Sequence, residues 1–401
     1  MKKIYIAAYH PSRFGKLMGM TVPEILRKSV EGCCREISTE AALLDCASVG
    51  AACNFSLNEQ GLLAGLMAQI PGLESKPMEA VENACASGGQ AVLSVVHKML
   101  AGLADTGIAV GYEKMRDAEG KMDGKLIGKV LGYFSHPDER EGKVFVFPHI
   151  FAEIMKAYMD EYGATERDFA TIAAQEYSNA NHNPCAQMQK VKVGVDDALR
   201  IEGFNRYVVD GLPLKTYDCS QITDGYAALI LATEEGLAKL GTRKQDCVEL
   251  AGFGQAVDPL RKEGRDVLRP AGANRAMQAA YERAGLTPAD INVAEIHDCF
   301  TVMGAIGTEV IGKARPGEGA QYWVEGKAAP EGECGINTSG GLVAKGHPIG
   351  ATGIAMIGWA AQQLLGKAPP QLQVRNARAA ATFNIGGPVC ASVCTVLKPA
   401  A

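Results

Sequence analysis

The chain has 401 residues, of which 47% are hydrophobic, and a formal net charge of −5 at pH 7. A chain of this length can bury a large core and has room for two or three domains. It has no basic excess and no Lys/Arg-rich run, so we expect no nucleic acid partner. No run of about 18 apolar residues is present, so we also expect no membrane partner or membrane span.

The 12 cysteines have no regular spacing and form no C-x-x-C pair. This pattern argues against a disulfide framework and against a zinc site, and it predicts a protein of the reducing cytoplasm.

Residues 1–115 alternate short apolar runs with helical patterns. They are predicted to contain strands at 4–8, 47–52 and 106–111 and helices at 22–37 and 58–70. Alternation of this kind predicts an α/β fold with a mostly parallel sheet that has helices on its faces.

Residues 116–217 are more polar, with amphipathic segments around 151–159 and 169–180, and we interpret them as an inserted, mainly helical domain. The apolar run 226–232 then returns the chain to the first sheet, so residues 218–245 complete the first half. Residues 246–401 form a second alternating half, with strands expected at 248–253, 293–296, 381–384 and 389–397.

Cys85 lies where an apolar, strand-like segment gives way to a helical pattern through Val92, Val95, Val96 and Met99. Free N–H groups and the positive end of a helix dipole favour an anion at such a turn. We therefore predict that this thiol ionises more readily than a free cysteine and acts as a nucleophile. A buried structural role is the commoner one for any single cysteine and remains the alternative.

His347 occupies a similar position in the second half. Pro348 suits the first turn of the following apolar helix, because its missing N–H would have no partner there. The positive end of that helix disfavours imidazolium, so we expect a neutral histidine that can accept a proton. If the two halves face each other, Cys85 and His347 meet in one cleft as nucleophile and base. A hydrogen-bonded structural histidine is the alternative.

Two further segments carry polar groups at predicted strand ends. Residues 295–301 contain His297, Asp298 and Cys299, which are costly to bury without partners and therefore favour a cleft position. Cys299 could exchange protons there, and His297 could donate to an oxyanion. Adjacent residues rarely converge on one ion, so no metal site is predicted. Residues 383–387 end in two glycines, which could present a backbone N–H to a substrate or could form an ordinary turn.

Four motifs together resemble those of a thiolase. They are Glu-Asn-Ala-Cys-Ala-Ser-Gly at 82–88, His-Asp-Cys-Phe at 297–300, Ser-Gly-Gly-Leu-Val-Ala-Lys-Gly-His-Pro-Ile-Gly-Ala-Thr-Gly at 339–353 and Asn-Ile-Gly-Gly at 384–387. The second motif is similar to that of the sterol-carrier-protein-type and archaeal-type thiolases. Other thiolases place a second cysteine in the C-terminal motif. Asn384 stands at that position here, so the resemblance assigns the second cysteine to Cys299.

The resemblance implies a five-layered αβαβα thiolase fold of two similar halves, with a loop domain inserted in the first. It also implies the making or cleaving of 3-ketoacyl-CoA by a ping-pong route. Cys85, deprotonated by His347, takes up the acyl group, and Cys299 exchanges the α-proton of the second acyl-CoA. His297 and His347 stabilise the enolate oxygen, through a water held by His297.

The resemblance further implies an oxyanion hole made by the backbone N–H groups of Cys85 and Gly386, and substrate binding by Ser339. Acyl-CoA and CoA are the expected substrates, with no metal or cofactor, and the expected assembly is a homodimer or a dimer of dimers. Two alternatives remain. One is an acyltransferase that needs a small zinc-ribbon/OB-fold partner protein, and the other is a non-catalytic scaffold that binds acyl-CoA.

Overall fold

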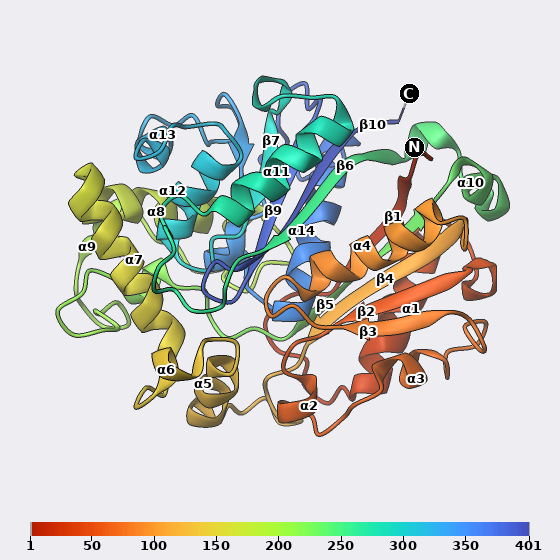
Figure 1. Ribbon diagram of the computed structural model, residues 1–401, viewed down its shortest axis with the longest axis horizontal. Coiled ribbons are helices and arrows are strands. Elements are labelled where there is room, and N and C mark those ends of the chain that lie inside the picture. The colour runs from red at the N-terminus through yellow and green to blue at the C-terminus, as the bar shows by residue number, and fades with distance from the viewer. Residues whose placement is uncertain (1, 401) are drawn as a thin grey trace.

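The computed structural model describes residues 2–400 and contains one ten-stranded sheet in the order β3-β2-β4-β5-β1-β6-β10-β9-β7-β8 (Figure 1). The strands are β1 (Tyr5–Pro11), β2 (Cys46–Gly50), β3 (Met78–Val81), β4 (Thr106–Glu113), β5 (Gly225–Ala232), β6 (Val248–Val257), β7 (Val293–Ile296), β8 (Gly335–Ile336), β9 (Ala380–Gly386) and β10 (Ala391–Pro399).

The α-helices are α1 (Val22–Glu36), α2 (Asn54–Leu57), α3 (Leu63–Met67), α4 (Ser87–Leu100), α5 (Gly124–Gly132), α6 (Pro137–Arg140), α7 (Val146–Tyr162), α8 (Glu166–His182), α9 (Val195–Leu199), α10 (Glu234–Leu240), α11 (Ala271–Ala284), α12 (Thr301–Val310), α13 (Gly319–Val324) and α14 (Ile349–Leu364). Short 3₁₀ turns occur at η1 (Ala41–Leu43), η2 (Thr216–Asp218), η3 (Lys244–Asp246) and η4 (Pro288–Asp290), and η5 (Gly341–Lys345) is a π-helical turn.

The strand order shows that the molecule consists of two similar halves. Strands β1 to β5 are arranged 3-2-4-5-1, and strands β6 to β10 repeat this order as 8-7-9-10-6. The halves join where β1 pairs with β6, with Tyr5 opposite Glu249 and Ile6 opposite Val248. The predicted two-half architecture is therefore confirmed.

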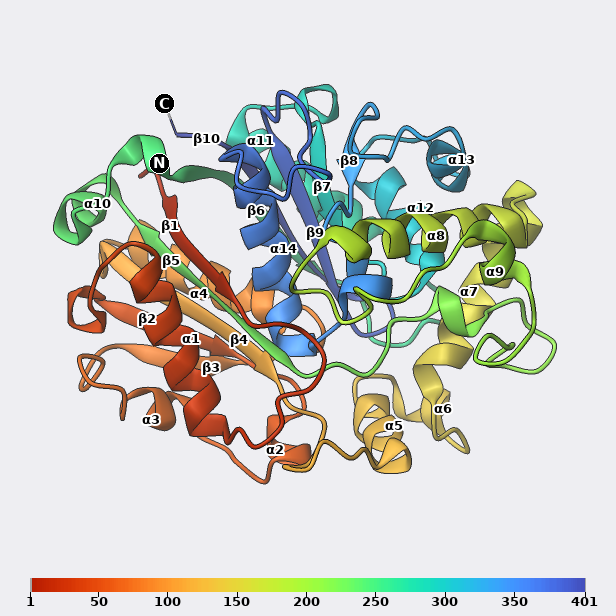
Figure 2. The ribbon, with the colours of Figure 1, turned by 180° about the vertical axis from the view of Figure 1, so that it is seen from behind.

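Helices α4 and α14 occupy equivalent places in the two halves and pack against each other between them. Helix α1 covers the outer face of the first half and α11 that of the second, which produces the five layers (Figures 1 and 2). The residues predicted to line the buried face of α4 all lie in the central core, where they meet Ile354 and Ile357 of α14. The starts of the two helices approach closely, because a Cβ atom at Gly88 would lie 2.5 Å from the carbonyl oxygen of Gly350.

The prediction of a mostly parallel sheet was wrong. Only the pairs β2–β3, β2–β4, β7–β8 and β7–β9 are parallel, and the other five are antiparallel. The short link between β9 and β10 permits only a hairpin, because a parallel connection needs a crossover of a dozen or more residues.

The single helix predicted at 58–70 was also wrong. The structure has α2, then a loop, then α3 in this part of the chain. Leu62 adopts a left-handed conformation with φ of 47°, and the side-chain amide of Asn54 binds the carbonyl oxygen of Gln60. Side chains such as asparagine compete with helical hydrogen bonds in this way.

Helices α5 to α9 lie between β4 and β5 in the sequence and gather on one side of the molecule in both views (Figures 1 and 2). Helix α8 packs against α12, α13 and η5 of the second half, whereas α5 contacts α2 of the first half. The exact limits of the inserted domain remain a prediction. Within residues 2–400, no helix combines the length and apolar character that a membrane crossing requires.

Candidate active site

Cys85 lies in a tight turn between β3 and α4, as the sequence predicted. Ala84 has a φ of 48°, and the Ser87 hydroxyl donates to the Ala84 carbonyl oxygen at 2.6 Å. The same hydroxyl accepts from the N–H of Asn83 at 2.9 Å, which closes the turn. The Cys85 side chain is partly exposed and lines a pocket.

His347 lies directly before Pro348 and the first residue of α14. Its Nδ1 is 2.7 Å from the Thr352 hydroxyl, which itself donates to the Pro348 carbonyl oxygen at 3.0 Å. Because the single hydroxyl hydrogen is engaged there, Thr352 accepts from Nδ1–H, and the lone pair of His347 lies on Nε2. Burial lowers the pKa of His347 to about 3, so the ring is neutral and can act as a base.

The segment after β7 brings His297 and Cys299 to the same place. The Asp298 carboxylate accepts from the backbone N–H of Leu342 at 2.8 Å and anchors this segment to η5. The Cys299 carbonyl oxygen accepts from the N–H of Ser220 at 2.9 Å. Burial raises the pKa of the Cys299 thiol well above its usual value, so this group is a neutral thiol.

The structure brings the four predicted catalytic side chains to one pocket. The sulfur of Cys85 and one ring nitrogen each of His297 and His347 lie within 4.8 Å of one another. The two imidazoles meet edge to face, with centroids 4.9 Å apart and an interplanar angle of 88°. Cys299 lines the same pocket, which has a volume of about 880 Å³ including its open mouth.

The predicted ease of ionisation of Cys85 was wrong. Burial, followed by the negative charge of Glu113, raises the pKa of the Cys85 thiol to about 12, although the N–H of Gly387 opposes this. Desolvation therefore outweighs the helix N-terminus. Cys85 and His347 are both neutral at rest, and a thiolate must form during the reaction.

Two other predicted residues are placed differently from expectation. Gly387, rather than Gly386, lines the pocket, and its N–H faces the Cys85 sulfur. Gly386 packs behind the turn, where a Cβ atom would lie 2.2 Å from the Asn83 carbonyl oxygen. Ser339 is fully buried outside the pocket lining, and its hydroxyl donates to Glu295 at 2.5 Å. Its predicted contact with substrate gains no support from this position.

Sequence reasoning missed Glu113, which is buried at the end of β4. Its carboxylate accepts from the N–H groups of Ala52, Cys53 and Gly350 at 2.9–3.1 Å and so ties both halves together beneath Cys85. Burial raises the pKa of Glu113 to about 7. Glu113 belongs to none of the four motifs. The one signal in the sequence is an acidic residue at the end of an apolar strand.

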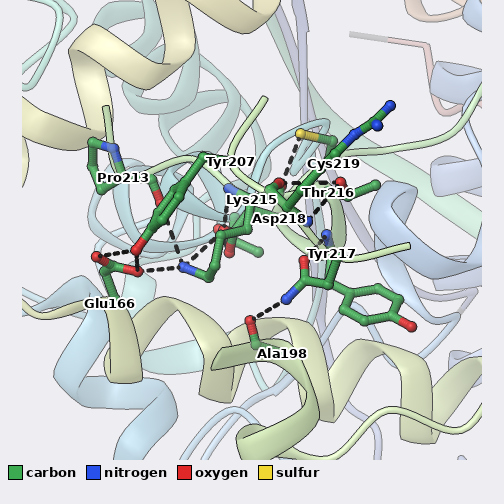
Figure 3. A network of polar contacts seen from close by, with 12 residues as sticks. Glu166, Ala198, Tyr207, Pro213, Lys215, Thr216, Tyr217, Asp218 and Cys219 are labelled. Atoms are coloured by element: carbon green, nitrogen blue, oxygen red, sulfur yellow. Dashed lines mark hydrogen bonds and ion pairs between the residues drawn. The ribbon is translucent and has the colours of Figure 1, made fainter. Parts of the chain in front are cut away.

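A second missed group centres on Lys215, whose side chain is 0% exposed (Figure 3). Its ammonium lies 2.9 Å from Glu166 and 3.3 Å from Asp218. Asp218 also accepts from the Thr301 hydroxyl at 2.9 Å, so the ion pairs connect the inserted helices to the start of α12. Cys219, which lines the pocket, donates to the Lys215 carbonyl oxygen at 3.2 Å. The network therefore supports one wall of the pocket.

The resting state of Cys85 can be tested by alkylation with iodoacetamide between about pH 7 and about pH 9.5, read by peptide mass spectrometry. Because the thiolate fraction follows a pKa of about 12, the Cys85 rate should rise ~10-fold per pH unit without reaching a plateau. Glu113→Gln removes the neighbouring charge and should raise the rate. A plateau below about pH 8 would instead reveal a resting thiolate–imidazolium pair and contradict this assignment.

Comparison with known proteins agrees with this geometry. The family model for the thiolase N-terminal domain matches residues 5–235, and the model for the thiolase C-terminal domain-like family matches residues 254–399. The acetyl-CoA acetyltransferase of Methanothermobacter thermautotrophicus is 32% identical over 387 residues, which cover 96% of this chain and 97% of that protein.

Sterol carrier protein 2 of Bos taurus is 33% identical over 328 residues, which cover 79% of this chain and 58% of that protein. The solved structure of the Ltp2-ChsH2(DUF35) aldolase superposes with a TM-score of 0.81 at 21% identity, covering 99% of this chain and 98% of that one. The two family matches span most of the sequence, and each corresponds to one of the two structural halves. The chain belongs to the thiolase family.

Proposed function

We propose that this protein is a thiolase enzyme, an acyltransferase that makes or cleaves 3-ketoacyl-CoA through an acyl-cysteine. The observation that carries the proposal is the convergence of Cys85, His297 and His347 within 4.8 Å beside Cys299. Three segments distant in the sequence supply these four groups, and polar side chains gathered in one pocket in this way mark a functional site.

In the first half-reaction, Nε2 of His347 takes the proton of the Cys85 thiol as the sulfur attacks the acyl-CoA carbonyl carbon. The C–S bond to CoA then breaks, and the CoA sulfur takes the proton from His347. The N–H groups of Cys85 and Gly387 stabilise the tetrahedral oxyanion. The product is an acyl-Cys85 thioester and free CoA.

In the second half-reaction, Cys299 exchanges a proton with the α-carbon of the second thioester. For synthesis, Cys299 first gives its proton to His347, and its thiolate then removes the α-proton. The resulting enolate attacks the acyl-Cys85 carbon, the C–S bond to Cys85 breaks, and the Cys85 sulfur takes the proton back from His347.

For cleavage, the same step runs in reverse: His347 takes the proton of Cys85, the sulfur attacks the 3-keto carbon, and the C–C bond breaks to leave acyl-Cys85. The neutral Cys299 thiol protonates the α-carbon of the shorter acyl-CoA and then regains a proton from His347. His297 donates a hydrogen bond to the enolate oxygen, because a thioester α-proton is too weakly acidic to leave without such a donor.

Both half-reactions transfer acyl groups and protons with no net oxidation or reduction. Acyl-CoA and CoA are therefore sufficient reactants, and the proposal requires no redox cofactor. We further propose a cytoplasmic location, which suits the free state of the 12 cysteines.

A homodimer is also part of the proposal. Strand β3 forms one edge of the sheet, and Phe55 and Leu62 in the adjoining segment are 78% and 81% exposed. A free edge beside apolar side chains favours association with a second copy. Sedimentation equilibrium should give the mass of a dimer or of a dimer of dimers, and a monomer at micromolar concentration would contradict this part.

A partner-dependent acyltransferase is the second candidate. The structural neighbour described above is named as an aldolase with a DUF35 protein. At 21% sequence identity, its similarity to this chain concerns the fold alone. Activity of the purified protein alone would exclude a strict need for such a partner.

Intact mass spectrometry after incubation with acetyl-CoA should separate the roles of the two cysteines. We expect an acetyl adduct on the wild-type protein and on Cys299→Ala, and none on Cys85→Ala. Cys299→Ala should nevertheless lose ~10²-fold or more of thiolysis activity, because it lacks the proton donor for the α-carbon. An adduct on Cys85→Ala, or full thiolysis by Cys299→Ala, would contradict the assigned roles. No adduct on the wild type would favour the scaffold alternative.

The pocket also predicts a preference for acyl groups larger than acetyl. Beyond the catalytic groups its lining is mainly apolar and includes Leu131, Phe134, Phe147, Phe151 and Phe300. The rings of Phe151 and Phe300 stack at 4.5 Å. Each methylene buried there contributes up to ~0.8 kcal/mol, which is about fourfold in kcat/KM.

We therefore expect kcat/KM for thiolysis to rise from acetoacetyl-CoA to 3-ketoacyl-CoAs of medium chain length. Leu131→Phe should lower the values for the longer substrates and spare acetoacetyl-CoA. A profile that falls from the shortest substrate onward would show that this lining does not hold the acyl chain.

A further inference from the structure

Asn384 lies on β9 with only 2% of its surface exposed, where it contacts both catalytic turns. Its side-chain nitrogen Nδ2 is 3.0 Å from the carbonyl oxygen of Cys85 and 3.0 Å from Nδ1 of His297. One amide group thus connects the nucleophile's turn with the histidine after β7.

The orientation of this amide follows from its neighbours. The Cys85 carbonyl oxygen can only accept, so the group that faces it must be the NH₂. The other side of the amide faces Gly89 and Gly353, where Cβ atoms would lie 3.0 Å and 2.3 Å from Oδ1. Exchanging the two amide atoms would place two acceptors 3.0 Å apart. The NH₂ group therefore donates one hydrogen to Cys85 and the other to His297.

This contact determines the tautomer of His297. A ring nitrogen that accepts a hydrogen bond carries no proton, so a neutral His297 must carry its hydrogen on Nε2. The residue is 0% exposed, and within the described part of the chain Nε2 has no hydrogen-bond partner. A buried N–H without a partner costs free energy unless a ligand satisfies it. The His297 ring lines the pocket, with one of its nitrogens within 4.8 Å of the Cys85 sulfur and its centroid 4.9 Å from that of His347.

We propose that Asn384 is a positioning residue that holds His297 as the Nε2–H tautomer, so that its N–H meets the thioester oxygen of the second substrate. This role rests on the function proposed above. Thr352 imposes the opposite tautomer on His347, whose Nε2 carries a lone pair. The pocket therefore presents one proton acceptor for Cys85 and one hydrogen-bond donor for the enolate.

The same arrangement affects metal binding. Cys85, His297 and His347 are close enough to hold one ion. A histidine ligand, however, binds through a lone pair and usually donates its other N–H to a carboxylate or carbonyl. Here the Asn384 amide donates to Nδ1 of His297 instead of accepting from it. The ring hydrogen is therefore on Nε2, which has no lone pair left for a metal ion. Asn384 therefore favours an oxyanion over a cation at this position.

The tautomer can be measured directly by ¹⁵N NMR of the full-length protein labelled at histidine, without ligands, near neutral pH. The chain has seven histidines, and the loss of one signal pair in His297→Gln assigns that residue. We expect Nε2 of His297 to be protonated and Nδ1 to be free. In Asn384→Asp, a carboxylate that accepts from Nδ1–H should reverse the two. Protonated Nδ1 in the wild type, or no change in Asn384→Asp, would overturn the proposal.

Kinetics should separate this role from a merely structural one. Asn384→Asp and Asn384→Ala should slow thiolysis and α-proton exchange by ~10²–10³-fold, the cost of losing one oxyanion donor. Acylation of Cys85, followed by intact mass, should change by less than about fivefold, because His297 acts only in the second half-reaction. Equal losses in both half-reactions would show that Asn384 merely supports the Cys85 turn, and would overturn the proposal.

Thr382→Ser is a matched control, because Thr382 is a buried residue two positions earlier on β9 whose hydroxyl pairs with Thr395 at 2.7 Å. It should leave both half-reactions and the His297 signals unchanged. If the wild-type protein forms no acyl-enzyme and cleaves no 3-ketoacyl-CoA, the proposed function fails. The NMR experiment then still decides separately whether Asn384 sets the tautomer.

Discussion

The close approach of the N-terminal ends of α4 and α14 is the constraint on which the site depends. Two sheet halves of the same topology each supply a strand, a turn and a central helix. The helix starts can meet only because glycines occupy the contact, and any side chain at Gly88 would overlap the backbone of Gly350. Cys85 and His347 each lie two positions before the first residue of these helices, and their side chains face the same small volume.

This geometry also determines the resting charge of the site. Two helix N-termini favour negative charge, yet the site is dry enough that Cys85 remains a thiol and His347 a neutral imidazole. Loss of hydration penalises a thiolate and an imidazolium alike, and no cationic side chain of residues 2–400 is among the groups that most affect the pKa of Cys85. The acidic neighbour Glu113 adds to the penalty. The nucleophile is therefore formed when substrate is in place, which protects the free enzyme against adventitious alkylation.

Much of the fold was readable from local patterns, and the limits of that reading have physical causes. Apolar periodicity located α4, a strand-to-helix turn located Cys85, and the proline at a helix start located His347, because each of these signals is local in the sequence. The strand directions depend on how the chain returns after the inserted helices, and apolar runs do not encode this. Burial of Cys85 arises from residues distant in the sequence, since it packs against a cluster that includes Met115, Ile127 and Ile349. The helix end that was visible in the sequence therefore suggested the wrong pKa shift. Ser339 sits within a motif, but its hydroxyl serves Glu295, a partner 44 positions away.

Asn384 shows how one substitution of residue type can follow from another. The resemblance places a cysteine at this position in enzymes that carry their second sulfur in the C-terminal motif. Here Cys299 supplies that sulfur from the segment after β7, two residues beyond His297. A second thiol at position 384 would be redundant and would be a weak donor to Nδ1 of His297. An amide at the same position can bind the Cys85 carbonyl and the imidazole at once, which a thiol with a single hydrogen cannot do. The second cysteine at position 299 and the amide at position 384 therefore belong to one arrangement. In this arrangement Asn384 on β9, at the position that holds the second cysteine in other thiolases, orients His297, which lies two residues before Cys299.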